Sequence, residues 1–158
     1  MTDTIVIYFS GADAAHSTVK KAAEALASYA GADTYEIVCE NPYSTDTKVL
    51  VTQALKDKEN NARPALVQPL PDMAGYRNIL LGFPNWCGTA PMPVFSFMDS
   101  GLLNGKSVSC FVVNDGAGLQ DSRKDLETAY PQVTFEDFEA VNSSDASSQL
   151  LEWIQEKM

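Results

Sequence analysis

The residues with the clearest chemical potential lie in a loop that joins an apolar run to a proline. Leu80–Phe83 is apolar, and Pro84–Pro91 follows with an asparagine, a tryptophan, a glycine and a threonine. This order is typical of a buried strand with a loop at its carboxyl end, which is where open parallel α/β sheets bind ligands. The loop is therefore a candidate cradle for a flat ring with polar edges. Trp86 would either line that cradle or pack at a helix junction.

A second candidate site follows the first apolar run, Ile5–Phe9. Ser10–Ala15 is a loop of small residues, and His16, Ser17 and Thr18 then precede a stretch of strong helix formers. A strand, a hydroxyl-bearing loop and a helix present backbone N–H groups and a positive dipole end to an anion. A simpler interpretation is that Ser17 or Thr18 only caps the helix.

The elements that must position these loops alternate along the chain. Apolar runs predict strands, and segments with helical periodicity follow them. The predicted strands are 5–9, 34–39, 77–83, 106–113 and 133–141, and the predicted helices are 19–30, 47–59, 91–100, 121–130 and a last one capped by Ser143 or Ser144. Within the second predicted helix, Val49, Leu50, Ala54 and Leu55 form an apolar stripe.

This alternation predicts a single α/β domain over residues 1–158, with three layers and helices on both faces of a parallel sheet. The commonest strand order for five such strands is 2-1-3-4-5. In that order the first loop and the Trp86 loop lie side by side, where the strand order reverses. A glycine-rich turn after the fourth strand, Asn114–Gly118, would be next along. Three loops suited to ligand binding would therefore meet at one crevice.

Composition excludes several classes of partner. The 158 residues include 21 acidic and 11 basic side chains, a formal net charge of -10. Nucleic-acid binding needs clustered Lys and Arg, so it is excluded, whereas docking onto basic protein surfaces is compatible with this charge. No apolar run could span a membrane and no signal peptide is recognisable, so no membrane partner is expected.

The cysteines and the histidine give no sign of a metal site or of a hydrolase. Cys39, Cys87 and Cys110 are odd in number and lack metal-ligand spacing, which indicates a reduced, cytoplasmic protein. The sole histidine, His16, adjoins Ser17, but no Gly-x-Ser-x-Gly elbow is present. We therefore expect neither a metal ion nor a catalytic triad.

With these residues in place, the chain resembles the flavodoxin family, and within it a short bacterial group with a Pro-x-Trp-x-Gly-Thr loop. The resemblance runs essentially from end to end. Its most specific motifs are Arg63–Pro64 and the Trp86 loop. Further matching segments are 6–10, 31–33, 36–37, 41–43, 61–62, 105–106 and 116–119, together with Thr18.

The resemblance implies a flavodoxin-like fold, non-covalently bound FMN and electron transfer between redox partner proteins. The phosphate would bind the first loop, the flavin ring would lie against the Trp86 loop, and the glycine-rich turn would close the other side. The implied cofactor-binding residues are Ser10, His16, Ser17, Thr18, Pro84, Asn85, Trp86, Cys87, Gly88, Asp115, Gly116 and Gly118. No catalytic residue of the chain is implied, because the cofactor itself carries the redox chemistry. The redox partner proteins would dock on an acidic surface of this chain.

Departures from the family pattern leave two other functions open. The first loop lacks the family's Ser-Gly-Asn-Thr signature and contains Asp13, and Cys87 stands where relatives often carry a second tryptophan. The enzymatic alternative is an FMN-dependent NAD(P)H or quinone-type reductase, although no Gly-x-Gly-x-x-Gly fingerprint is present. The third possibility is a flavodoxin fold that has lost its cofactor and serves as a binding module.

Overall fold

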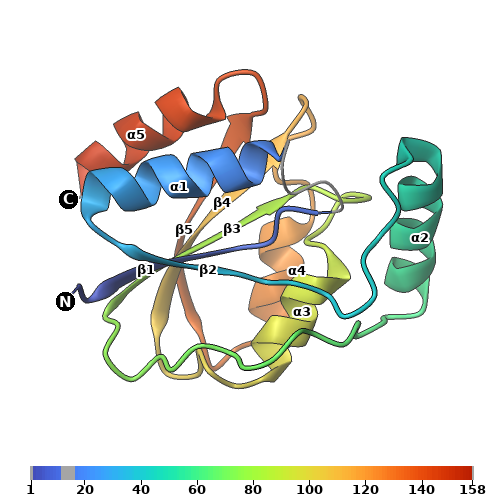
Figure 1. Ribbon diagram of the computed structural model, residues 1–158, viewed down its shortest axis with the longest axis horizontal. Helices are drawn as coiled ribbons and strands as arrows, with labels where there is room; N and C mark the ends of the chain where they lie inside the picture. The colour runs from blue at the N-terminus through green and yellow to red at the C-terminus, as the bar shows by residue number, and fades with distance from the viewer. Residues whose placement is uncertain (1, 12–16, 158) are drawn as a thin grey trace.

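Five parallel strands form the centre of the molecule in a computed structural model that describes residues 2–11 and 17–157 (Figure 1). Their order is β2-β1-β3-β4-β5, which confirms the predicted order. The strands are β1 Thr4–Tyr8, β2 Asp33–Glu36, β3 Asn78–Pro84, β4 Ser107–Asn114 and β5 Thr134–Asn142. The three inner strands are buried almost throughout, whereas β5, at the sheet edge, is buried only at Phe135, Phe138 and Val141.

Helices cover both faces of the sheet and complete the three-layer α/β fold. They are α1 Thr18–Ala30, α2 Thr47–Glu59, α3 Met92–Asp99, α4 Ser122–Ala129 and α5 Ala146–Lys157. Helices α1 and α5 lie together on one face, α3 and α4 lie on the other, and α2 stands apart beyond the edge of the sheet (Figure 1). The described helices include none with the length and hydropathy of a membrane span.

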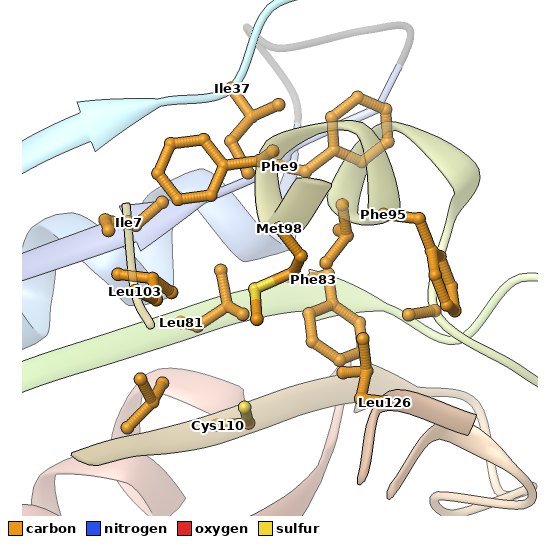
Figure 2. Close-up of a cluster of buried hydrophobic side chains, with 14 of the residues drawn as sticks. Ile7, Phe9, Ile37, Leu81, Phe83, Phe95, Met98, Leu103, Cys110 and Leu126 are labelled. Carbon is orange, nitrogen blue, oxygen red and sulfur yellow. The ribbon is translucent and has the colours of Figure 1, made fainter. Parts of the chain in front are cut away.

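Each face of the sheet has its own hydrophobic core. Figure 2 shows the larger one, in which Ile7, Leu81 and Phe83 of the sheet meet the side chains of α3 and α4. On the opposite face, Leu80 and Phe111 pack against α1 and α5. Alternate residues of one strand therefore serve both cores, as the period of two in a strand requires.

One glycine makes the centre of the sheet possible. A Cβ at Gly82 of β3 would lie 2.0 Å from Cζ of Phe111 in the neighbouring strand β4. The Phe111 ring thus packs over a site where only hydrogen leaves room.

Two features at the edges differ from the sequence predictions. Strand β2 ends at Glu36, earlier than predicted. The Ile37 N–H still donates to the Tyr8 carbonyl of β1, but the Val38 carbonyl accepts from the Val67 N–H instead. Cys39, predicted to be in this strand, instead forms an antiparallel bridge with Leu66 and is buried, as expected. Helix α5 begins at Ala146, too late for the predicted caps, and the Ser143 hydroxyl donates instead to the Asp115 carboxylate.

Helix α2 has the predicted bounds but not the predicted packing. The expected apolar stripe is wrong, since Val49 and Leu55 are 47% and 45% exposed, and only Ala54 of this helix is buried. The physical reason is its position beyond the sheet, where no core covers it. The connection that leads back to β3 is anchored by Arg63, whose guanidinium pairs with Asp99 at 2.7 Å and lies over the Phe95 ring.

Both ends of the chain lie at the amino edge of the sheet, away from the loops discussed below (Figure 1). Strand β1 starts there, and α5 runs back there after β5.

Candidate functional site

A cavity of about 920 Å³ opens at the carboxyl edge of the sheet, where the loops after β1, β3 and β4 meet. This is a size typical of cofactor sites. The predicted site residues that line it are Ser10, Ser17, Thr18, Pro84, Asn85, Trp86, Cys87, Gly88 and Asp115. Gly116 and Gly118 line a neighbouring hollow of about 510 Å³ beside β5 and α5. His16 lies outside the described residues.

The N-terminus of α1 opens onto this cavity. Ser17 has extended backbone angles and its Oγ accepts from the Lys20 N–H at 3.2 Å, so it is the N-cap of the helix. Thr18 is the first helical residue and also lines the cavity. The first turn of α1 carries no acidic residue, which leaves the positive end of the helix dipole available to an anion. Ser17 therefore caps the helix and also lies at the site.

The Trp86 loop is a tight hairpin turn. Trp86 and Thr89 exchange backbone hydrogen bonds of 3.0 and 3.1 Å. The two central residues, Cys87 and Gly88, have φ values of 55° and 86°. Positive φ at both central positions is the signature of a type I′ turn. For Cys87, which has a Cβ, this conformation costs about 1 kcal/mol.

Trp86 is half-buried, and its ring contacts two other aromatic side chains. Its centroid lies 5.2 Å from that of Phe9 and 5.0 Å from that of Tyr43, both edge to face. Burial and the neighbouring Asp57 carboxylate raise the pKa of Tyr43, so its hydroxyl stays protonated and donates to Asp57 at 2.6 Å. Trp86 also lines the cavity. Trp86 thus packs within the fold while it also forms part of the site.

Asn85 connects the Trp86 loop to the loop after β4. Its Nδ2 donates to the Gly118 carbonyl at 2.9 Å and to Gln120 Oε1 at 3.1 Å. Its Oδ1 accepts from the Gly88 N–H at 3.0 Å. The side chain predicted to touch a ligand is therefore engaged in holding two loops in register.

Asn114 shapes the glycine-rich turn in a similar way. Its Oδ1 accepts from the N–H groups of Gly116 and Gly118 at 2.9 and 3.0 Å, and its Nδ2 donates to the Val141 carbonyl at 3.0 Å. Asn114 is buried and also lines the cavity. Sequence reasoning placed the turn but missed this residue. The available signal was an asparagine directly before Asp-Gly at a strand end, which favours an Asx turn.

Comparison with known proteins decides the family. A sequence model of the flavodoxins matches residues 3–157. The chain belongs to the flavodoxin family. No curated protein matches it significantly.

Solved structures share the fold of this flavodoxin over nearly their whole length. A Bacteroides uniformis protein, described provisionally as a flavoprotein, is 27% identical with a TM-score of 0.77, covering 94% of this chain and 97% of its own. A Bacteroides eggerthii protein with the same provisional description is 24% identical with a TM-score of 0.75, covering 95% and 96%. A Lactobacillus acidophilus flavoprotein in complex with FMN is 19% identical with a TM-score of 0.77, covering 98% and 99%.

This flavodoxin has one wall of its cavity that the sequence did not reveal. Residues of α2 and of the turn before it line the cavity, namely Ser44, Thr45, Thr47, Leu50 and Val51. A helical sequence shows which of its residues share a face, but it does not show which surface that face meets.

The described residues that line the cavity include a single charged side chain, Asp115, whose carboxylate accepts from Ser143. The Ser10 hydroxyl likewise donates to a carboxylate, that of Glu36. Among the described residues, no group of three His, Cys, Asp or Glu is placed to hold a metal ion. Any anion at this site would therefore be held by backbone N–H groups and hydroxyls.

Proposed function

We propose that the protein binds FMN non-covalently at this cavity and transfers electrons between redox partners. The observation that carries the proposal is the meeting of three loops at one cavity that joins a helix N-terminus to an aromatic wall. The helix N-terminus suits a phosphate, and the aromatic wall suits a flat ring system. The related fold of the Lactobacillus acidophilus flavoprotein, which is in complex with FMN, supports this choice of ligand.

The residues present fit FMN. The N-terminal N–H groups of α1 and the Thr18 hydroxyl would hold the phosphate, since no Lys or Arg is among the described lining residues. Pro84, Trp86 and the turn at Cys87 would lie along the ring. Bound FMN supplies the one-electron chemistry, whereas the protein binds and orients it.

The chain's own contribution is a preorganised site. The Asn85 and Asn114 side chains fix the loops after β3 and β4 to one another and to the sheet. Thr89, which is buried, donates to Asp125 at 2.6 Å and ties the Trp86 turn to α4. Loops held in this way lose little freedom when a ligand binds, so less of the binding energy is spent on ordering them.

The test is a titration of flavin-free protein with FMN, followed by stepwise anaerobic reduction. We expect stoichiometric quenching of FMN fluorescence, shifted absorption bands, and reduction in two separate one-electron steps. Failure to quench FMN fluorescence would contradict the proposal and favour the binding-module alternative. Oxidation of NAD(P)H by the purified protein alone would favour the reductase.

We further propose that redox partners dock through a basic surface of their own onto an acidic surface of this protein. The net charge of -10 supports this, as do Glu139, Glu152 and Glu156 around the hollow beside Gly116 and Gly118. Electron exchange with a cationic acceptor protein should slow as ionic strength rises, because salt screens this attraction. A rate that does not depend on salt would count against it.

We also propose a cytoplasmic location. All three cysteines are free. Cysteines kept as thiols are typical of a reducing compartment. Fractionation of cells that express the protein tests this directly, and recovery from an oxidising compartment would contradict it.

A further inference from the structure

The second half of α2 is docked on the Trp86 loop. Between Ala54, Asp57 and Lys58 on one side and Trp86 on the other, the remaining void is only about 10 Å³. The helix is thus held closely at this end, although it contributes little to either core.

Three polar contacts fix the rotation of α2 about its own axis. Lys58 Nζ donates to the Cys87 carbonyl at 2.6 Å, in the hairpin turn of the site. Asp57 accepts from the Tyr43 hydroxyl at 2.6 Å, and Gln53 Oε1 accepts from the Ser44 N–H at 2.9 Å. These contacts orient one face of the helix toward the site.

The first half of the same face is open. At 100° per residue, Thr47, Leu50 and Val51 share a face with Ala54 and Lys58, and these three residues line the cavity. Val51 is 52% exposed. The helix therefore extends past its docked end and presents two aliphatic side chains to the cavity, in which Trp86 forms another wall.

We propose that α2 is a wall of the flavin site, in which Leu50 and Val51 pack against the apolar rim of the ring system. This inference rests on the proposed binding of FMN and adds the part of the ligand that α2 recognises. The occupant follows from position, since these side chains line the cavity that Trp86 also lines. Both side chains are already covered in part, and their further, partial burial by a ligand would strengthen binding by about tenfold.

The test compares two double variants of α2. Leu50→Ser with Val51→Ser alters the face toward the cavity, and Val49→Ser with Leu55→Ser alters exposed residues that do not line it. None of the four side chains is buried in a core, so both variants should fold, which circular dichroism checks. We expect the first variant to weaken FMN and riboflavin equally, by about tenfold. We expect the control to change both affinities less than about twofold, because its side chains meet no ligand.

The possible outcomes separate the inference from the proposed function. A wild-type protein that binds no flavin would refute the proposed function. Unchanged flavin affinities in the first variant would refute only the proposal that α2 forms a wall of the flavin site. Weakening of FMN alone would overturn the inference, because it would place α2 at the phosphate. A first variant that loses self-association while it keeps its flavin affinity would overturn it too, and would assign the face to a second copy of the chain.

Hydrogen exchange gives a second readout that does not depend on the substitutions. Addition of FMN or riboflavin to the wild-type protein should slow amide exchange across the first half of α2, because a ligand that packs there holds the helix in place. Slower exchange at the α1 N-terminus with no change in α2 would overturn the inference.

Discussion

Thr18 lies at the start of α1 and lines the cavity, so it tests the proposed phosphate end of the site. We expect Thr18→Ala to weaken FMN by about ten- to a hundredfold, the effect of one hydrogen bond to a charged group. The affinity for riboflavin, which has no phosphate, should fall much less. Isothermal titration with both ligands measures the difference.

Thr18→Ser is the matched control, because it keeps the hydroxyl and removes only a methyl group. Its FMN affinity should stay near that of the wild type. Equal losses for FMN and riboflavin in Thr18→Ala would move this residue away from the phosphate.

Trp86 tests the proposed ring end of the site. Trp86→Ala should weaken FMN and riboflavin alike and change the absorption of the bound ring. It should also lower the free energy of unfolding by about 3 kcal/mol, since the contacts with Phe9 and Tyr43 are lost. Trp86→Phe should keep most of the flavin affinity and most of the free energy of unfolding. An unchanged spectrum and affinity in Trp86→Ala would leave this side chain only its packing role.

Sequence patterns revealed the roles of site residues that act locally and missed the roles of those whose partners are distant. Ser17 and Trp86 were predictable, because a helix cap and a loop aromatic can be recognised from their immediate neighbours. Asn85 and Asn114 bond to Gly118 and Val141, 33 and 27 positions away. Such pairs depend on strand register, which a single sequence does not reveal.

The pairing of β5 with α5 contains a pH-dependent contact. Asp137 Oδ2 accepts from Trp153 Nε1 at 3.0 Å and lies 3.5 Å from Lys157 Nζ. The Trp153 hydrogen bond, with help from Lys157, lowers the pKa of Asp137. A lowered pKa means that the ionised carboxylate stabilises the fold above the pKa of the unfolded chain, about 4. This stabilisation is lost as the pH falls through the folded value.

Asp137→Asn should therefore be less stable than the wild type at pH 7, and the difference should shrink toward pH 3. Urea unfolding at several pH values measures this. Glu136→Gln, a change at the exposed neighbour, should show no such trend. A stability difference that is the same at pH 7 and pH 3 would show that the charge of Asp137 has no part in the contact.

At the scale of elements, the sequence predicted where helices and strands begin and end better than how they pack. The bounds of α2 were correct, because its N-cap Asp46 and the Arg63–Pro64 break are local signals. Its attachment through Lys58 to the Cys87 carbonyl was not predictable, since a surface lysine has no preferred partner in a sequence pattern.

The strand order of the whole molecule was predictable, because alternation and right-handed crossovers leave few arrangements. The close approach at the centre of the sheet was not. Gly82→Ala should destabilise the protein by about 3 kcal/mol or more, because the new methyl group would clash with the Phe111 ring. Thermal and urea unfolding measure this loss.

Two further variants make that prediction specific. Phe111→Leu combined with Gly82→Ala should be more stable than the sum of the single changes, since the smaller side chain relieves the clash. Gly75→Ala is the control and should be nearly neutral, because a Cβ there meets nothing within 4 Å. Simple additivity of the two changes would show that Phe111 is not the obstacle.

The position of both chain ends at the amino edge determines how the protein can be attached to a surface. An affinity tag or a surface linker can be attached at either end while the loops at the opposite edge face the solution (Figure 1). Every molecule would then be held in a similar orientation, with the cavity at the carboxyl edge pointing away from the support.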